Sequence, residues 1–463
     1  MNVFFVIPDI KGVLARPTSP HVGTAYLAAV LLKNNHKVKI LDMRLGYDEH
    51  NLLKELKEFN PDLVCVTCVS MHYKHTYYLI NKIKENNFKV CVGGPHVSTT
   101  KTKILEQCKA DFAVKGEAEE TLVEICENKS LKDLKGVIWR DNTQIIENED
   151  RPLIHDLNKL PFPAFQLFEL DQYIDKKLPI VSSRGCPYGC TYCSIKLTMG
   201  RGFRPRSAEN VVNELEHWNK QYNYTYFGIN DDCFSLDLDR AKRICDLIIE
   251  RNLKIKWEIR NGIRVDRVDE ELLTKMKKAG CFYIAFGVES ANQDVIDKMK
   301  KSITPEKAKE AILLANKVGI KKGAFFIIGL PGEDFNKFKN SLRFALSLPL
   351  DELRFYNPIP FPGTELMEWV KTNGKFIIEP ETYLNEIGSL DNQPIFETDN
   401  FPIAQRKKAY NIAESYVMKY LMKSEFGPFI GTIGWIVWKP KLTRKFIFEY
   451  GKKLWSLKRK FAK

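Results

Sequence analysis

Short apolar runs rich in β-branched residues alternate with amphipathic stretches twice along this chain, and no other feature restricts its fold as strongly. Continuous apolar strands separated by helices are typical of parallel sheets covered by helices on both faces. The sequence therefore predicts an α/β protein with two such units. The expected strands are 3–7, 38–41, 63–67, 90–92 and 112–114 in the first unit, and 178–183, 224–229, 255–259, 282–287, 324–329 and 353–356 in the second.

The first unit, residues 1–128, is expected to be a doubly wound, Rossmann-like domain with its ligand at the carboxyl ends of the strands. No GxGxxG follows the first strand and no P-loop is present, which disfavours NAD and ATP. Glycines at these ends would let the backbone approach a large flat ligand or a phosphate, although tight turns alone would also use them. The strand-end candidates are Ser70, Gly93, Gly94, His96, Gly116 and Glu117.

A connector is expected over residues 129–177, where a hairpin turning at Asp141-Asn142 is followed by an irregular, proline-punctuated crossing. Residues 178–370 then repeat a strand–helix unit six times, two fewer than a closed eight-fold barrel. We expect a partial (β/α)6 barrel with its chemistry at the C-terminal ends of the strands.

The last part of the chain, residues 371–463, loses this alternation and is predicted to be mainly helical. Residues 439–463 hold ten Lys or Arg and one acid, which is a net charge of +9 out of +13 for the whole chain. Apolar residues recur there every three or four positions, which predicts a basic amphipathic helix. Such a helix could dock on the protein's own core, lie on a membrane surface or, least favoured, contact nucleic acid.

Eleven cysteines occur in the chain, and the N-terminus has no basic segment typical of a signal peptide. An odd number of scattered cysteines favours reduced thiols in the cytoplasm over a disulfide framework. No apolar run reaches the ~18 residues that span a bilayer. Most of the cysteines lie in apolar strand or helix patterns and are expected to pack in the core.

Cys186, Cys190 and Cys193 are different, because they are spaced by three and then two residues on one short loop after the first strand of the second unit. A zinc site would need a fourth Cys or His close by, and none lies within twenty residues downstream of Cys193 except His217. Three thiolates suit a [4Fe–4S] cluster with one iron left open for a ligand that is not protein.

The segment Arg184-Gly-Cys-Pro-Tyr-Gly-Cys-Thr-Tyr-Cys193 resembles the cluster loop of the radical S-adenosylmethionine (SAM) superfamily. The resemblance extends to the strand ends 227–234, 264–266, 287–290, 328–333 and 358–365. It implies that the open iron binds SAM and that one electron, from an external flavodoxin or ferredoxin, cleaves SAM to a 5′-deoxyadenosyl radical. The residues it implies for SAM binding are Tyr192, Asp232, Arg264, Glu289, Ser290 and Gly329.

Structural alternatives remain for most of these residues. Glu289 and Ser290 could cap the next helix, Asp232 could do the same for the helix near residue 238, and Arg264 could form a salt bridge near Asp266. Gly329 could belong to a mere turn.

A doubly wound domain before a radical SAM barrel, with Gly93-Gly-Pro-His96 and Gly116-Glu-Ala-Glu119, is similar to the cobalamin-binding class of that superfamily. The resemblance covers residues 1–370 and implies cobalamin at the strand-end candidates named above. The DxHxxG motif that supplies a histidine to cobalt in other cobalamin domains is absent, since Met43 and Arg44 follow Asp42. A degenerate domain without cobalamin is the alternative.

The function implied by the resemblance is methyl transfer to an unactivated carbon of a small molecule or lipid. Cyclisation, ring contraction or C–C or C–O bond formation without methyl transfer is the alternative within the same class. RNA modification is disfavoured because the chain shows no RNA-binding barrel after the radical domain, and an electron carrier would not need the large barrel. The expected location is the cytoplasm or its membrane surface.

Overall fold

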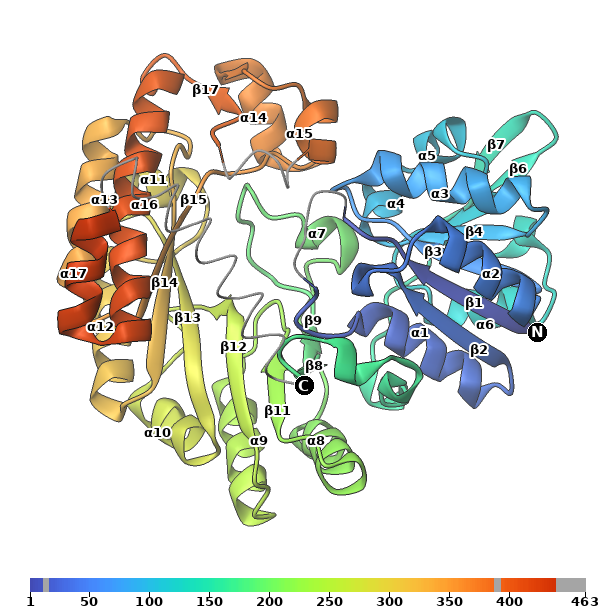
Figure 1. Cartoon of the computed structure of the whole chain (residues 1–463), viewed down its shortest axis with the longest axis horizontal. Helices are drawn as coiled ribbons and strands as arrows, with labels where there is room; N and C mark the ends of the chain where they lie inside the picture. The colour runs from blue at the N-terminus through green and yellow to red at the C-terminus, as the bar shows by residue number, and fades with distance from the viewer. Residues whose placement is uncertain (11–15, 387–392, 439–463) are drawn as a thin grey trace.

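The computed structural model describes residues 1–10, 16–386 and 393–438, and it contains two parallel-stranded units that lie side by side (Figure 1). The α/β class and the order of a doubly wound unit, a partial barrel and C-terminal helices are confirmed. The C-terminal helices lie mainly along the outer edge of the barrel (Figure 1).

The first unit is a seven-stranded sheet with the order β2-β1-β3-β4-β5-β6-β7. Its parallel part is doubly wound, because the chain crosses from β1 to β2 on one side and then to β3, β4 and β5 on the other. The strands of this part are β1 (Asn2–Ile7), β2 (Lys37–Asp42), β3 (Leu63–Thr67), β4 (Val90–Gly93) and β5 (Phe112–Val114). The helices are α1 (Val22–Lys33), α2 (Glu49–Phe59), α3 (Tyr73–Glu85), α4 (Pro95–Thr100), α5 (Lys103–Gln107) and α6 (Glu119–Cys126).

The hairpin β6 (Val137–Asp141) and β7 (Gln144–Glu147) extends this first sheet instead of standing apart as a connector. β6 pairs antiparallel with β5, with Phe112 opposite Trp139. β5 is only three residues long, and the hairpin covers backbone groups that would otherwise form an exposed sheet edge. The sheet therefore continues past residue 129, where the sequence placed the start of the connector.

The second unit is an open six-stranded parallel barrel with the order β15-β14-β13-β12-β11-β8. Ser207 and Thr304 cap the N-termini of two of its helices, and their hydroxyl oxygens accept from backbone N–H groups three residues on. The strands are β8 (Leu178–Ile180), β11 (Tyr226–Ile229), β12 (Lys256–Ile263), β13 (Cys281–Glu289), β14 (Lys321–Ile327) and β15 (Glu352–Tyr356). The helices are α8 (Ala208–Tyr222), α9 (Leu238–Glu250), α10 (Glu270–Lys278), α11 (Gln293–Lys298), α12 (Pro305–Val318) and α13 (Phe335–Ser347).

Charged side chains line the inner face of the barrel near the amino ends of the strands. Side chains alternate along β12, so Trp257 and Ile259 join the hydrophobic core while Glu258 and Arg260 lie on the opposite face. The ion pairs run in sequence across the sheet: Lys177–Glu258 (2.8 Å), Glu258–Arg260 (2.9 Å), Arg260–Glu352 (3.3 Å) and Glu352–Arg354 (2.9 Å). We call this chain of ion pairs the polar floor.

The C-terminal region joins both units. α16 (Ile403–Phe426) packs on β15 and α13, and three of its residues, together with Phe401 just before it, belong to the barrel core. α14 (Glu365–Asn373) and α15 (Pro380–Glu386) instead share a core with α3 of the first unit, where His72 N donates to Leu384 O (2.7 Å). α17 (Pro428–Trp438) ends the described chain, and the basic segment 439–463 lies outside the described residues.

None of the helices in the described part of the chain has the length and apolar character needed to cross a membrane.

Candidate active site

The three spaced cysteines lie on a loop at the carboxyl end of β8. The chain passes through β9 (Ser183–Arg184), forms the loop with the short helix α7 (Ile195–Thr198), and returns in β10 (Arg204–Pro205). β9 and β10 pair antiparallel with Arg184 opposite Arg204, so the two ends of the loop meet in a narrow neck. All eleven cysteines are free thiols, and the three on this loop are partly exposed whereas the other eight are buried.

The thiols of the loop lie close enough to influence each other's ionisation. Burial and the two other cysteines raise the pKa of Cys193, while a hydrogen bond from the Cys233 thiol lowers the pKa of Cys186 to about 7. Among the described residues, no group of three or more Cys, His, Asp and Glu side chains is arranged to hold a single metal ion. The three thiols share one partly exposed loop and are available as the protein ligands of an iron–sulfur cluster.

Two carboxylates fix the start of the cysteine loop to the barrel. Asp231, after β11, accepts hydrogen bonds from Ser182 N (2.6 Å), Ser182 Oγ (2.5 Å) and Ser183 Oγ (2.7 Å). Asp232 accepts from Gly185 N (2.8 Å), and burial raises its pKa. Asp232 was predicted to contact SAM, and the structure places one of its oxygens on the backbone of the loop itself.

Tyr192 joins the loop to the end of β13. Its hydroxyl donates to Glu289 Oε1 (3.1 Å), and Glu289 also forms a buried ion pair with Lys301. Glu289 has a φ of 66°, a left-handed conformation that is uncommon for a non-glycine residue and marks backbone strain. A Cβ on Gly287 would lie 2.7 Å from Glu289 Oε1 and 2.8 Å from Lys301 Nζ, so only glycine leaves room for this pair.

Arg264 lies beside the cluster loop but is already engaged by protein groups. Its guanidinium forms a two-pronged bond with Asp266 (2.9 and 3.1 Å) and donates to Lys301 O (2.9 Å). It also covers the ring of Tyr188 with the guanidinium carbon 3.4 Å from the ring centre. Asp266 offsets the effect of burial and raises the pKa of Arg264, which therefore remains a cation near Cys186 and Cys190.

The structure does not bring Ser290 and Gly329 to the cysteine loop by any contact of their own. Ser290 is fully buried and its hydroxyl lies 3.3 Å from the hydroxyl of Ser341 on α13. Gly329 has a φ of 92°, and a Cβ there would collide with the guanidinium of Arg406 from α16. Gly329 N donates to Glu333, which is buried close to the same arginine. A SAM contact by either residue stays a prediction.

On the first unit, Ser70 and His96 form a buried pair at the carboxyl ends of β3 and β4. His96 Nδ1 lies 3.0 Å from Ser70 Oγ and Nε2 lies 2.9 Å from the hydroxyl of Tyr77, while the ring stacks on Tyr73 at 4.8 Å. Burial lowers the pKa of His96 to about 4, so the ring is neutral at pH 7. Both ring nitrogens are occupied, and His96 therefore shapes this loop in the structure as it stands.

The glycines of the first unit differ in what they make possible. Gly94 has a φ of 101°, and a Cβ there would lie 2.7 Å from Cys68 O, so the turn itself requires glycine. Gly93 is less constrained, since the nearest atom to its Cβ would be Val114 O at 3.7 Å. Gly116 has a φ of 72° and open space where its side chain would be. These positions leave backbone exposed at the strand ends.

Glu117 was predicted to contact cobalamin, but its carboxylate is held by protein groups from both units. Oε2 accepts from Ile154 N (2.7 Å), and the arginines at the neck of the cysteine loop donate to it from Arg184 (2.9 Å) and Arg204 (2.8 and 2.9 Å). Burial opposes ionisation, yet Arg184 and Arg204 lower the pKa of Glu117. A cobalamin contact by Glu117 stays a prediction.

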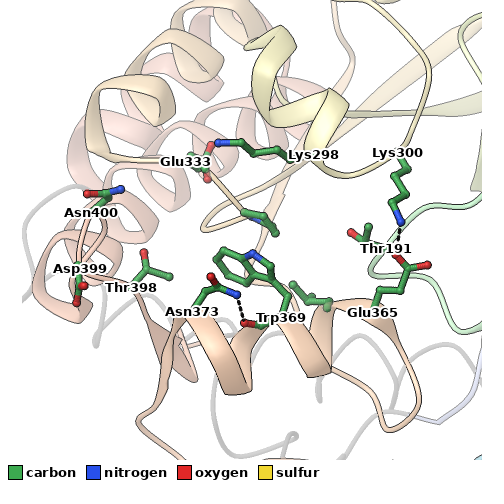
Figure 2. Close-up of a pocket in the computed structure, with 13 residues that line it drawn as sticks. Thr191, Lys298, Lys300, Glu333, Glu365, Trp369, Asn373, Thr398, Asp399 and Asn400 are labelled. Atoms are coloured by element: carbon green, nitrogen blue, oxygen red, sulfur yellow. Dashed lines mark hydrogen bonds and ion pairs between the residues drawn. The ribbon is translucent and has the colours of Figure 1, made fainter.

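A cavity of about 610 Å³ opens beside the cysteine loop, between the loop after β14, α14 and the chain before α16 (Figure 2). This volume lies within the ~300–1,000 Å³ typical of small-molecule sites. Thr191 Oγ1 and Glu333 Oε1 are buried polar atoms without a hydrogen-bond partner in the described structure, and both residues line the cavity. Trp369 projects into the cavity from α14 (Figure 2).

Sequence reasoning missed several groups that surround the loop. Lys301 and Arg204 belong to no motif that was recognised, and Arg406 lies more than 70 residues from the strand end that it covers. Cys233 directly follows the two aspartates in the sequence, but no local pattern indicates that its thiol contacts Cys186 in the fold. These contacts join residues far apart in the chain, which local patterns do not report.

Comparison with known families agrees with both halves of the chain. Residues 180–345 match the radical SAM superfamily and residues 12–126 match the B12 binding domain. An uncharacterised methyltransferase of Pyrococcus horikoshii is 30% identical over 97% of this chain and 95% of that protein. The cytidylyl-2-hydroxyethylphosphonate methyltransferase of Streptomyces wedmorensis is 27% identical over 80% of this chain and 81% of that protein.

Other relatives carry different names. An anaerobic magnesium-protoporphyrin IX monomethyl ester cyclase of Cereibacter sphaeroides is 27% identical over 80% of this chain and 63% of that protein. Among solved structures, the radical SAM methyltransferase TsrM from Kitasatospora setae, with cobalamin and a [4Fe–4S] cluster bound, superposes with a TM-score of 0.68 at 18% identity over 80% of this chain and 76% of that chain. At that identity the likeness concerns the fold alone.

The partial barrel, its cysteine loop and these matches define a radical SAM enzyme. More narrowly, the chain belongs to the cobalamin-binding class of that superfamily, whose cofactors are a [4Fe–4S] cluster, SAM and cobalamin. The residues present fit these groups, because three accessible thiols share one loop and the strand ends of the first unit expose backbone at Gly93 and Gly116.

Proposed function

We propose that this enzyme transfers a methyl group to an unactivated carbon of a small molecule or lipid. The observation that carries the proposal is the direct contact between the neck of the cysteine loop and the strand-end loop of the B12 binding domain, through Arg184 and Glu117. This contact brings the two cofactor-binding regions of the chain together. When bound, the cofactors supply the radical and the methyl group.

The residues of the chain position and insulate that chemistry. Cys186, Cys190 and Cys193 would hold the cluster. Tyr192 and Glu289 offer a hydroxyl and a carboxyl group next to it, and Lys301 pairs with Glu289 in a buried setting. The polar floor places paired charges near the amino ends of the strands, and we expect ligands to approach from the opposite, carboxyl side.

Methyl transfer makes a specific demand on the products. The anaerobically reconstituted enzyme with SAM, cobalamin and a low-potential reductant should form S-adenosylhomocysteine and 5′-deoxyadenosine in equal amounts in the presence of its substrate. The substrate can be sought by comparing the small molecules and lipids of a deletion strain with those of its parent. Formation of 5′-deoxyadenosine without S-adenosylhomocysteine while substrate is consumed would show a reaction without methyl transfer.

The natural electron donor is proposed to be a flavodoxin or ferredoxin, because the cluster loop is accessible at its cysteines and the described chain offers no second metal-binding group. Replacing the chemical reductant with a reduced flavodoxin should sustain SAM cleavage.

We further propose that α17 rests on a lipid surface. Five large apolar side chains at the end of α16 and along α17 are exposed: Phe426 (59%), Phe429 (78%), Ile430 (63%), Ile433 (49%) and Ile436 (57%). Phe429, Ile433 and Ile436 recur every three or four residues and therefore share one face of α17, while Phe426 ends α16. The sequence that follows directly, 439–463, has a net charge of +9, which complements anionic lipid headgroups.

Flotation of the full-length protein with vesicles tests this contact. We expect binding to phosphatidylcholine vesicles that contain phosphatidylglycerol, weaker binding to phosphatidylcholine alone, and loss of binding in a Phe429→Ser, Ile433→Ser variant. Ile249→Ser, an exposed apolar residue on α9, is the matched control. Absence of binding to both vesicle types, or a face occupied by a second copy in a stable dimer, would refute the proposal.

A further inference from the structure

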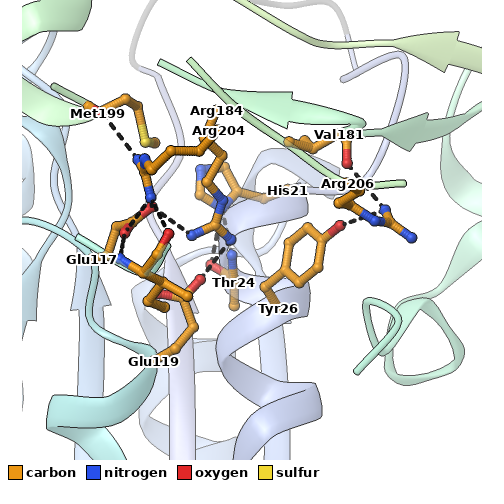
Figure 3. A network of polar contacts seen from close by, with 11 residues as sticks. His21, Thr24, Tyr26, Glu117, Glu119, Val181, Arg184, Met199, Arg204 and Arg206 are labelled. Carbon is orange, nitrogen blue, oxygen red and sulfur yellow. Dashed lines mark hydrogen bonds and ion pairs between the residues drawn. The ribbon is translucent and has the colours of Figure 1, made fainter. Parts of the chain in front are cut away.

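Two arginines and two glutamates form a buried cluster of charges between the B12 binding domain and the neck of the cysteine loop (Figure 3). Arg184 and Arg204 come from β9 and β10, and Glu117 and Glu119 come from the loop after β5 and the start of α6. All four residues are less than 8% exposed. The two charges of each sign cancel, so the cluster as a whole is neutral.

The hydrogen bonds of this cluster join the two units, and they start from both strands of the neck, β9 and β10. Arg184 divides its fork between Glu117 Oε1 (2.9 Å) and Glu119 Oε1 (2.6 Å). Arg204 donates to both oxygens of Glu117 (2.9 and 2.8 Å) and also to Met199 O (3.0 Å) inside the loop. Glu117 therefore holds both ends of the cysteine loop at one point of the B12 binding domain.

The neck itself is narrow and rigid. Gly185, with a φ of 82°, packs so closely against the backbone of Gly202 that no side chain fits. Asp231 and Asp232 hold the same segment on the barrel side through Ser182, Ser183 and Gly185. The loop is thus clamped between aspartates of its own barrel and glutamates of the neighbouring domain, and a shift at the glutamates would move the cysteines relative to that domain.

Buried ion pairs are weak contributors to stability, because desolvation cancels much of their attraction. Their directional hydrogen bonds do fix geometry, and an arginine fork fixes it in a plane. We infer that Glu117 and Glu119 are positioning residues that set the distance and orientation between the cluster loop and the cobalamin-binding strand ends. This inference rests on the proposed function only in requiring both cofactors to be bound.

The test compares the full-length holoenzyme with its Glu117→Gln and Glu119→Gln variants. Glu120→Gln is the matched control, because Glu120 is one residue away, 60% exposed, and pairs with Arg151 at the surface. Iron and cobalamin are quantified first. The decisive measurement is the spin–spin interaction between cob(II)alamin and the reduced cluster by pulsed electron paramagnetic resonance, which does not depend on turnover.

We expect wild type and Glu120→Gln to show one narrow distance distribution. Glu119→Gln should broaden it, and Glu117→Gln should shift it, at unchanged iron and cobalamin content. With substrate, the ratio of S-adenosylhomocysteine to 5′-deoxyadenosine should fall about tenfold or more, because small misplacements of reacting groups have large effects on rate. Glu119→Asp, which keeps the charge, should restore part of the ratio.

The variants could instead unfold at a lower temperature while the distances and the product ratio stay unchanged. That result would overturn the inference, because the four charges would then serve stability alone. Loss of cobalamin with an unchanged cysteine loop would also overturn it, because Glu117 would then be a cobalamin contact. Failure of methyl transfer in every protein, wild type included, would contradict the proposed function while the distance measurement still decides the inference. If Glu117→Gln does not fold, Glu119→Gln alone carries the test, since Glu117 keeps both arginines there.

Discussion

The Tyr192 hydroxyl donates a 3.1 Å hydrogen bond to Glu289 Oε1 and thereby joins the cysteine loop to the fourth strand of the barrel. Glu289 reaches this position only through a left-handed backbone conformation, and Lys301 balances its charge. Backbone strain of this kind persists only where the surroundings enforce it, and it is concentrated at functional sites. The pair therefore marks the point where the loop meets the barrel, and a SAM contact by either residue stays a prediction.

Removing the Tyr192 hydroxyl is expected to weaken SAM binding without disturbing the cluster. In Tyr192→Phe one hydrogen bond of about 1 kcal/mol is lost, which corresponds to roughly fivefold weaker SAM binding. Equilibrium binding of SAM to the reconstituted enzyme measures this change. Tyr222→Phe, an exposed tyrosine at the end of α8, should leave SAM affinity unchanged.

Replacing Glu289 should be more damaging, because Lys301 would remain buried without a carboxylate. Breaking one side of a buried pair costs about 3–5 kcal/mol, so Glu289→Gln should lower the unfolding temperature and abolish most SAM cleavage. A double variant, Glu289→Gln with Lys301→Met, should recover much of the stability and none of the cleavage. Recovery of cleavage in the double variant would show that the carboxylate does not serve the ligand.

Each of the three loop cysteines should be indispensable for the cluster. Cys186→Ala, Cys190→Ala and Cys193→Ala should each lose most of the roughly four irons per chain and the absorbance of the [4Fe–4S] cluster, because only three protein ligands are available to it. Iron content and visible absorbance measure the loss. Cys245→Ala, at a buried thiol on α9, is the control and should keep its iron.

His96 predicts how the first unit responds to acid. Burial lowers its folded pKa to about 4, below the usual value of 6.5. Between pH 6.5 and pH 4 the unfolded chain binds a proton at His96 and the folded chain does not. The free energy of unfolding is therefore highest above pH 6.5 and decreases as the pH falls towards 4. The loss amounts to about 3 kcal/mol over this range. Urea unfolding between pH 7 and pH 4 should show it.

A His96→Gln variant should unfold at lower urea concentration at pH 7, because its packing against Tyr73 and Tyr77 is altered, but its stability should vary less with pH. Equal slopes for the two proteins would mean that His96 is not the group that titrates.

Glu333 has the opposite dependence. Burial raises its pKa from 4.5 to about 7, so the folded state favours the protonated acid and its contribution to stability is lost as the pH rises from 4.5 to 7. Glu333→Gln keeps an acceptor for Gly329 N without a charge to bury. Its stability relative to wild type should therefore rise by up to about 3 kcal/mol across that range. A flat difference in unfolding free energy would contradict the shifted pKa.

The strands of both sheets could be predicted because their apolar runs report burial on two faces, which is a local property. The cysteine loop could be predicted because its three ligands lie within eight consecutive residues. The hairpin of residues 137–147 was recognisable as a hairpin, but its pairing with β5 was not, since nothing local indicates which sheet edge a hairpin covers.

The predicted SAM and cobalamin contacts show the same limit. Ser290 and Glu117 follow strand ends, where ligands are expected, but the partners that hold them in the structure are Ser341, Arg184 and Arg204. Those partners lie 51 to 87 residues away in the chain. A polar residue at a strand end is equally suited to bind a ligand or a distant side chain, and only the fold distinguishes the two.

The polar floor has a consequence for how substrates enter the enzyme and how products leave it. Its ion pairs run without interruption from Lys177 to Arg354, at the amino ends of the strands. Lys177 and Glu258 form its buried pair, and opening a passage there would leave these two charges unpaired, which is costly in a protein interior. Two molecules of SAM, the substrate and four products (S-adenosylhomocysteine, methionine, 5′-deoxyadenosine and the methylated substrate) would then all have to pass on the carboxyl side of the strands. Turnover should accordingly be governed by the order in which molecules leave, and an enzyme of this build should be inhibited by its own products.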